Sequence, residues 1–389
     1  MKVLFITHKY PPSVGGMQKQ SFELIRGMTG RMETLTLIHA GDHGKLWFFH
    51  RLKREVKTIL AQHPDLSLIH LNDGLMAVFA LPLKKITAVP IVVTLHGLDV
   101  VMPAPWYQKH ILPRIAHYDH FITVSRATAH ACIERGFDPA KVSIVPNGID
   151  TAFGDLPADP DYRTTLGRRT GIDLTDKKII VMLGRPVLRK GFSWFIREVM
   201  PHLPPDVVCL HIGPLARHMW LRLTLLRAIP FDIGTHLALI WGMPIDEPNL
   251  RRAAAHPTVA DRVRLLGACP VGDLVQILKC ADLFVMPNLS VPGDMEGFGL
   301  VALEASLCGL PVVAAAVDGI PDAIQEGKNG ILLPPGDPVV WVRRITELLA
   351  DRSALKALGT QGKEFSRATY GWSRMVEEYE TIFRRVADQ

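Results

Sequence analysis

The chain contains two successive series of short apolar segments, and this repetition constrains its fold more than any other feature. Segments rich in β-branched residues alternate with helical stretches, a pattern typical of α/β proteins with parallel sheets. The segments are apolar at nearly every position, as expected for strands that are buried on both faces. The expected strands cover residues 3–7, 35–39, 66–70, 91–95, 120–124 and 142–145 in the first series, and residues 178–183, 207–212, 263–267, 282–286, 310–315 and 330–334 in the second.

A stretch rich in Pro, Asp, Gly and Thr separates the two series at residues 147–176 and is the best candidate for a linker. We therefore expect two Rossmann-like domains that face each other across a cleft, one at residues 1–165 and one at residues 166–371. The helical stretch at residues 372–389 is expected to return to the first domain. Ligands of such sheets bind at the carboxyl ends of the strands.

Composition excludes several classes of protein. No apolar run reaches the roughly 18 residues that a membrane span requires. The N-terminal residues resemble a strand rather than a signal peptide. The five cysteines form no CxxC pair, so neither a disulfide framework nor a zinc site is expected. These features predict a cytoplasmic protein.

The positive charge is unevenly distributed. The net charge is +6, and residues 1–150 hold 17 Lys and Arg against 11 Asp and Glu, whereas the two kinds balance in the remainder. A basic patch on the first domain would suit an anionic membrane surface or a phosphorylated ligand. A solvated surface without a partner is an equally good interpretation.

Two glycines follow the first expected strand and directly precede a helical pattern. Gly15 and Gly16 would allow backbone N–H groups to approach a phosphate, which the helix dipole also favours. A tight turn without a ligand is an equally good interpretation, because the spacing is neither GxGxxG nor that of a P-loop.

Two cations follow the first strand of the second series. Arg185 and Lys190, in LGRPVLRKGF, are expected at the carboxyl end of that strand. An Arg can bind a diphosphate through two hydrogen bonds and a Lys as a point charge, and both would stabilise a leaving diphosphate. Arg189 is expected to point to solvent. The alternative for the whole segment is a solvated basic turn.

The segment GDMEGFGLVALEASLCGLPVVA contains two acids eight residues apart. Glu296 precedes a Gly-Phe-Gly sequence and is expected in a loop that enters a helix. The backbone N–H groups of Phe298, Gly299 and Leu300 would then be helix N-terminal donors for phosphate oxygens. Glu304 would lie in the helix and accept hydrogen bonds from a ribose diol, whereas Glu296 would accept them from a sugar. An exposed acid is the alternative for Glu296; the apolar neighbours of Glu304 favour a partner.

A histidine follows the fourth strand of the first series. His96 stands next to Gly97, with Asp99 nearby, and can hydrogen-bond a sugar or assist proton transfer. A purely structural role is the alternative.

In this order the motifs resemble those of the retaining glycosyltransferase family 4, whose members have the GT-B fold of two Rossmann-like domains. The resemblance implies transfer of a hexose from a UDP- or GDP-linked sugar to a glycan or lipid-linked acceptor, with retention at the anomeric carbon and without a metal or resident cofactor. Cell-envelope polysaccharide or glycolipid synthesis would be the setting. The resemblance spans the chain except about residues 40–60 and 213–260. The motifs that carry it are PPSVGG, TLHGLD, FITVSRAT, VPNGID, LGRPVLRKGF, RVRLLG, EGFGLVALEA, GLPVVA, GIPDAI and GILLPPGD.

The resemblance also implies a role for each matching residue. Residues 1–165 would be the acceptor-side domain and residues 166–371 the donor domain. Arg185 and Lys190 would bind the diphosphate, and Glu304 the ribose. Glu296 would bind the donor sugar with Phe298, Gly299 and Leu300; His96 would contact its primary hydroxyl; Gly15 and Gly16 would approach the phosphates; and Gly267 would lie near the base.

The sequence departs from the family in two places. Asp318 stands where the family usually has glycine, so its loop is expected to face the acceptor or solvent. Residues 213–260 are longer than the usual connection, and residues 218–229 are amphipathic and basic. Residues 45–60 also combine aromatic side chains with Lys and Arg. Both stretches are compatible with contact to an anionic membrane at its cytoplasmic face, or with ordinary packing. Residues 218–229 could alternatively cover the acceptor site.

Two other functions remain open at this stage. A GT-B relative that isomerises its nucleotide sugar would share the fold, although the acid pair and the basic pair argue against it. A non-catalytic sugar-nucleotide-binding protein would be expected to have lost part of that set. The one DxD sequence, Asp159-Pro160-Asp161, follows no strand and is interpreted as a linker turn rather than a metal site.

Overall fold

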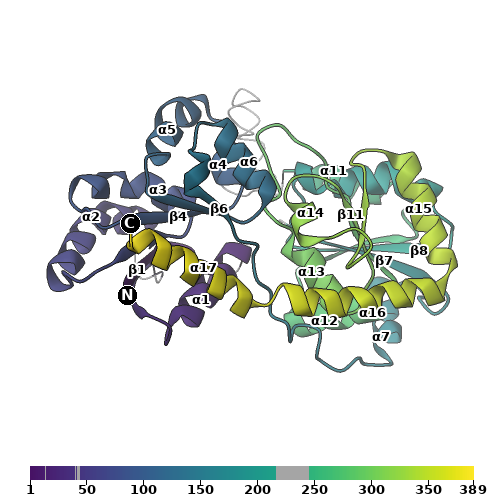
Figure 1. Cartoon of the computed structure of the whole chain (residues 1–389). Helices are drawn as coiled ribbons and strands as arrows, with labels where there is room; N and C mark the ends of the chain where they lie inside the picture. The colour runs from purple at the N-terminus through teal and green to yellow at the C-terminus, as the bar shows by residue number, and fades with distance from the viewer. Residues whose placement is uncertain (14, 40, 42–43, 216–244) are drawn as a thin grey trace. The chain divides into compact units, whose positions relative to one another are not determined.

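The computed structural model describes residues 1–13, 15–39, 41, 44–215 and 245–389, and the amphipathic stretch at 218–229 lies outside them (Figure 1). The chain divides into two compact units. Unit 1 comprises Met1–Ile149 and Tyr370–Gln389, and unit 2 comprises Asp150–Thr369. No helix within the described ranges is long and apolar enough to cross a membrane.

Unit 1 is built on a parallel sheet with the strand order β2-β1-β3-β4-β5-β6. Because β1 pairs with β2 on one side and with β3 on the other, the strand order reverses between β1 and β3. The strands are β1 (Lys2–Thr7), β2 (Glu33–Ile38), β3 (Leu68–Leu71), β4 (Ile91–Leu95), β5 (His120–Thr123) and β6 (Val142–Ile144). The helices are α1 (Gly16–Met28), α2 (Lys45–Gln62), α3 (Gly74–Ala80), α4 (Leu98–Val101), α5 (Leu112–Ile115), α6 (Arg126–Glu134) and α17 (Trp372–Ala387).

Unit 2 has a parallel sheet with the order β12-β11-β10-β7-β8-β9, in which the strand order reverses between β7 and β10. Its strands are β7 (Lys178–Leu183), β8 (Val207–Ile212), β9 (Val263–Gly267), β10 (Leu283–Met286), β11 (Val312–Ala315) and β12 (Ile331–Leu333). Its helices are α7 (Tyr162–Thr170), α8 (Phe192–Trp194), α11 (Glu247–Ala254), α12 (Val271–Cys280), α13 (Leu300–Leu307), α14 (Ile320–Ala323), α15 (Pro338–Ala350) and α16 (Arg352–Thr369).

The last helix completes the core of unit 1. α17 lies beside α1 at the opposite end of the sequence (Figure 1). Its buried Tyr379 and Phe383 pack in one apolar cluster with Phe5 of β1, and the rings of Phe5 and Phe383 are 6.0 Å apart. The Tyr379 hydroxyl is also within hydrogen-bond distance of Thr94 Oγ1 (3.0 Å). Unit 1 is therefore assembled from two distant parts of the chain.

The structure confirms the α/β fold and both series of strands, and each strand begins and ends within two residues of its expected position. The first expected domain boundary differs, because residues 150–165 fall in unit 2. There the backbone N–H of Asp159 donates to Gln276 Oε1 at 2.9 Å, and Gly154 lies against the carbonyl of Leu307. A Cβ at Gly154 would lie 2.0 Å from that oxygen, so this packing depends on glycine.

Candidate functional site

The topology of unit 2 marks one place where a ligand site is expected. In open parallel sheets, ligands bind beyond the carboxyl ends of the strands where the strand order reverses, because the flanking loops diverge there. In unit 2 these are the loops after β7 and β10. The loop after β7 contains Arg185, Arg189 and Lys190, and the loop after β10 contains Asn288, Asp294 and Glu296.

These two loops meet through an ion pair. The Nζ of Lys190 lies 2.8 Å from Oε2 of Glu296, and both side chains are largely buried. The approach depends on Gly191, which has a φ of 64°; a Cβ there would lie 2.0 Å from the carbonyl oxygen of Pro287. Glycine adopts this conformation without steric cost. The structure thus brings together two of the residues that the sequence analysis selected, although 106 positions separate them.

Arg189 does not point to solvent, so that expectation was wrong. Its side chain is 16% exposed, and its Nη1 lies 3.1 Å from both carboxylate oxygens of the fully buried Asp294. Its Nε donates to Oε2 of Glu296 at 3.3 Å. The reason is that Asp294, two residues before Glu296, supplies a buried partner that an isolated basic turn would lack.

Asn288 also contacts the acid. Its Nδ2 donates to Oε2 of Glu296 at 3.3 Å. The three contacts from Lys190, Arg189 and Asn288 all end on Oε2 of this carboxylate. A ligand hydroxyl that donates to Oε1 would displace none of these three donors.

The charges in this cluster stabilise one another. Burial opposes ionisation of Glu296, but the charges of Lys190 and Arg189 outweigh it and lower the pKa of the carboxyl to about 2. Burial lowers the pKa of Lys190, and Glu296 counteracts that shift. Arg185, which is exposed, is near enough for its charge to act on both Lys190 and Arg189. Three cations and two carboxylates therefore gather at the reversal of the sheet.

The Asp318 loop lies against this cluster rather than apart from it. Asp318 Oδ2 accepts a hydrogen bond from the Glu296 N–H at 3.0 Å, and the Gly319 N–H donates to the Glu296 carbonyl at 3.0 Å. Asp318 has a φ of 53°, a conformation in which glycine is more usual. Burial raises the pKa of Asp318, and the nearby charge of Glu296 raises it further. This loop fixes the backbone of Glu296.

The segment after Glu296 enters α13 as the sequence indicated. Gly299, with a φ of 105°, is the N-terminal boundary residue, and α13 begins at Leu300. Glu296 therefore lies in the entry loop, and Glu304 lies in the second turn, half-buried. Phe298 is 3% exposed and anchors the loop in the core. At β9, Gly267 has a φ of 74°, and a Cβ there would meet no atom of the described residues within 4 Å.

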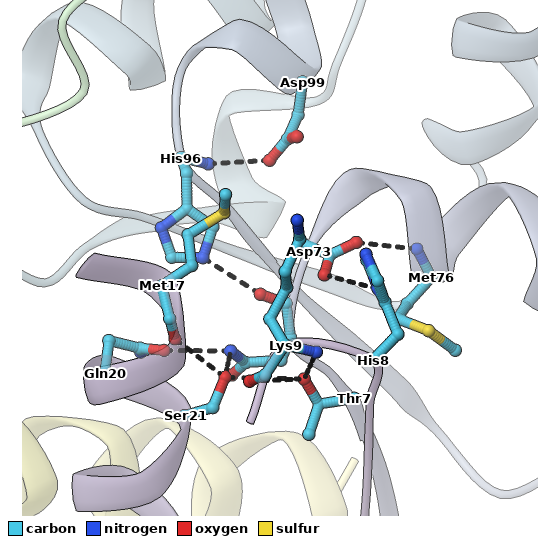
Figure 2. A network of polar contacts seen from close by, with 11 residues as sticks. Thr7, His8, Lys9, Met17, Gln20, Ser21, Asp73, Met76, His96 and Asp99 are labelled. Carbon is cyan, nitrogen blue, oxygen red and sulfur yellow. Dashed lines mark hydrogen bonds and ion pairs between the residues drawn. The ribbon is translucent and has the colours of Figure 1, made fainter. Parts of the chain in front are cut away.

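Unit 1 carries a second polar cluster at its own strand-order reversal, beyond β1 and β3 (Figure 2). His8 follows β1 and Asp73 follows β3, and His8 Nδ1 lies 3.1 Å from Asp73 Oδ2. Asp73 Oδ1 accepts from the Met76 N–H at 2.8 Å and so caps α3. Burial opposes the ionisation of Asp73, but the close contact with His8 lowers its pKa.

His96 belongs to the same cluster (Figure 2). Its Nε2 is 2.9 Å from the carbonyl oxygen of Asn72, and a carbonyl can only accept, so Nε2 carries the proton. In the neutral form of the ring, Nδ1 is then the acceptor that a ligand hydroxyl can use. Asp99 Oδ2 accepts from the His96 N–H at 3.0 Å and fixes the turn. Burial raises the pKa of Asp99, and the charge of Asp73 adds to that shift.

Gly15 and Gly16 begin α1, where Gly15 is the N-terminal boundary residue. The DxD sequence forms a turn in which the Asp161 N–H donates to Asp159 Oδ1 at 2.9 Å. In the part of the chain that the structure describes, no group of three His, Cys, Asp or Glu side chains has the arrangement of a metal site.

Sequence reasoning missed Asp294, Asn288, His8 and Asp73. One signal could have found three of them: Asn288, His8 and Asp73 each come within two residues of the end of a strand that borders a reversal. That signal needs the strand order, which the sequence alone does not supply.

Two family models match the chain. The model described as glycosyl transferases group 1 matches residues 168–365, and the model of glycosyltransferase family 4 matches residues 14–153. A GDP-mannose-dependent alpha-(1-6)-phosphatidylinositol monomannoside mannosyltransferase of Mycolicibacterium smegmatis is 28% identical over 394 residues, 95% of each chain. A D-inositol 3-phosphate glycosyltransferase of Salinispora arenicola is 30% identical over 333 residues, 81% of this chain and 67% of the relative.

Solved structures share the fold. Anabaena HepE, solved in complex with UDP and glucose, has a TM-score of 0.74 and 18% identity over 99% of this chain and 100% of that one. A sucrose-phosphate synthase of Thermosynechococcus elongatus has a TM-score of 0.71 and 21% identity over 99% and 98% of the two chains. The two parallel sheets, the matched family models and these relatives agree: the chain is a nucleotide-sugar glycosyltransferase of family 4 with the GT-B fold.

Proposed function

We propose that this enzyme transfers a hexose from a GDP- or UDP-linked sugar to a lipid-linked or glycan acceptor, with retention at the anomeric carbon and without a metal. The observation that carries the proposal is the Lys190–Glu296 pair at the reversal of the unit 2 sheet. It combines a cation suited to a diphosphate with a carboxylate suited to sugar hydroxyls. The exposed Arg185 beside it adds a second cation.

In this mechanism each residue has one task. Arg185 and Lys190 bind the diphosphate and stabilise the charge that grows on it as the glycosidic bond breaks, a task that metals perform elsewhere. The N–H groups at the start of α13, from Phe298, Gly299 and Leu300, hold phosphate oxygens. Glu296 Oε1 accepts from the sugar, Glu304 from the ribose, and His96 Nδ1 from a sugar hydroxyl. The acceptor attacks on the face that the diphosphate leaves, and the leaving phosphate takes its proton.

The relatives favour one donor and one class of acceptor to test first. One is named for GDP-mannose and a phosphatidylinositol mannoside, and the other for inositol 3-phosphate. We therefore propose GDP-mannose as the donor and an inositol-containing phospholipid or phosphate as the acceptor. Gly15 and Gly16 at the N-terminus of α1 are the groups of unit 1 proposed to meet phosphate.

A lipid acceptor would require contact with a membrane, and α2 has a suitable surface. Leu46 is 81% and Trp47 45% exposed at its first turn. Lys53, Arg54 and Lys57 lie on the same exposed side of the helix, since residues three, four, seven and eight apart share a face. Its partly buried Phe49 stacks on Phe79 of α3 at 4.0 Å between ring centroids. Basic side chains beside exposed apolar ones are typical of helices that bind anionic membranes.

Ligand binding tests the donor proposal. GDP, UDP, ADP and TDP are each added in turn, and the unfolding temperature is measured, because a ligand that binds the native state raises it. We expect GDP to give the largest shift. Product analysis with GDP-mannose and phosphatidylinositol then tests transfer, and an α-linked product would support retention. An isomerised sugar nucleotide without acceptor would favour the isomerase, and binding without turnover the non-catalytic alternative.

Vesicle co-sedimentation tests the membrane proposal. The wild type should sediment with vesicles that contain phosphatidylserine and not with pure phosphatidylcholine. Reversal of the charges of Lys53, Arg54 and Lys57 should abolish this. Reversal of three exposed cations of unit 2, Arg343, Arg352 and Lys356, is the matched control and should have no effect. Equal loss in both variants would contradict a specific surface on α2.

A further inference from the structure

The Lys190–Glu296 pair poses a problem for the proposed function, on which this inference rests. Lys190 Nζ already lies 2.8 Å from Glu296 Oε2 and would have to turn toward a donor diphosphate. Glu296 is largely buried, and a carboxylate in such a place that loses its counter-charge is strongly destabilised. Lys190 could therefore serve the diphosphate only if another cation stays with Glu296.

Arg189 has the position of that second cation. Its Nε lies 3.3 Å from the same Oε2 atom that Lys190 contacts. Its Nη1 is held by both oxygens of Asp294, at 3.1 Å each, and the Asp294 side chain is wholly inaccessible to solvent. The planar guanidinium can bond two carboxylates at once through separate nitrogens, which an ammonium cannot do with the same geometry.

The two carboxylates that Arg189 contacts differ in their exposure to solvent. The side chain of Asp294 is 0% exposed, whereas that of Glu296 is 12% exposed. Burial opposes the charged form of Arg189, but the charges of Glu296 and Asp294 outweigh it and raise the pKa, so the guanidinium stays charged. Lys190, in contrast, has one short side-chain contact to release among the residues that the structure describes, the one to Glu296.

We propose that Arg189, anchored by Asp294, is a positioning residue that keeps Glu296 paired when Lys190 moves to the donor diphosphate. Arg189 and Lys190 are thus alternative counter-ions of one carboxylate. Arg189 serves the site through Glu296 and need not touch the donor.

A double-mutant cycle on the unliganded protein tests this pairing. Lys190→Met and Arg189→Met each leave Glu296 one cation. Lys190→Met should therefore lower the urea midpoint of unfolding modestly, whereas Arg189→Met also removes the partner of the buried Asp294 and should lower it more. The double variant removes both and should lower the midpoint by clearly more than the sum of the single effects. Additive effects would overturn the proposal. Arg197→Met, which removes an exposed Arg paired with its neighbour Glu198, is the matched control.

Nucleoside diphosphate binding tests the consequence for the donor. Arg189→Met should weaken the binding of GDP or UDP about tenfold, the loss expected for one charge-assisted contact, and Arg197→Met should not. Arg189→Lys should restore part of the affinity, because it keeps the charge and loses the second bond. Unchanged affinity in Arg189→Met would overturn the proposal. If the wild type binds no nucleoside diphosphate, the proposed function fails, while the unfolding cycle still decides whether the two cations share Glu296.

Discussion

The two units place polar clusters at equivalent points of their sheets but build them from different chemistry. In unit 2, the loops after β7 and β10 meet through Lys190, Arg189, Asp294 and Glu296, which are fully ionic. In unit 1, the loops after β1 and β3 meet through His8 and Asp73 and are surrounded by amide and hydroxyl groups. The same topology therefore gives one site of high charge density and one of low charge density.

The difference matches two kinds of ligand group. A diphosphate carries concentrated negative charge and needs cations that a protein must otherwise keep paired. Neutral hydroxyl groups need only oriented donors and acceptors, such as His96 Nδ1. We infer that the unit 2 cluster is suited to the donor diphosphate and the unit 1 cluster to hydroxyls.

The largest effect is expected at Lys190. Lys190→Ala should lower turnover about 100-fold or more, because it removes one preorganised charge from the leaving diphosphate. Steady-state kinetics with donor and acceptor at saturation measure this loss. A variant that keeps a near-normal rate would show that the ionic cluster has no catalytic advantage over the cluster of unit 1.

The second largest effect is expected in acid unfolding, where the carboxylate of Glu296 in the unit 2 cluster should make stability depend on pH. Glu296 has a folded pKa of about 2 against an ordinary value of 4.5, so the native state binds fewer protons than the unfolded state between these values. Its contribution to stability is therefore full above about pH 4.5 and is lost as the pH falls toward 2. Glu296→Gln should flatten the fall of the unfolding free energy over that range. The same slope in both proteins would contradict the ionic pairing.

Substitution of Asp73 should show how much the His8–Asp73 pair of unit 1 contributes to the unfolding free energy. Asp73→Ala removes the cap of α3 and leaves His8 without its carboxylate, which should cost about 2 kcal/mol of unfolding free energy. Asp73→Asn keeps a capping oxygen and should cost less. Urea unfolding at pH 7 measures both. Equal losses would mean that only the negative charge matters.

The smallest effect is expected at His96. His96→Ala should lower kcat/KM about tenfold, since it removes a single hydrogen-bond acceptor for a hydroxyl. The unfolding midpoint, measured in parallel, separates this effect from loss of the bond to Asn72. A loss as large as that of Lys190→Ala would erase the proposed difference between the clusters.

The sequence predicted the architecture well, because strands that are buried on both faces leave an unambiguous apolar pattern. It also placed Lys190 after a strand and Glu296 in the loop that enters a helix, and the fold brings these two side chains within 2.8 Å of each other. It could not place Arg189, because a side chain on a short turn has no periodicity, and its partner Asp294 is 105 positions away. Nor could it find the His8–Asp73 pair, which depends on β1 and β3 being neighbours.

The way α17 completes unit 1 has a consequence for biosynthesis. The ribosome makes residues 150–369 before it makes the helix that supplies Tyr379 and Phe383 to the core of unit 1. The nascent first unit must therefore wait, with part of its apolar interior uncovered, until the second has left the exit tunnel. We therefore expect the nascent chain to depend on chaperones while residues 150–369 are being made. Nonsense mutations that remove α17 should leave the first unit unable to complete its core.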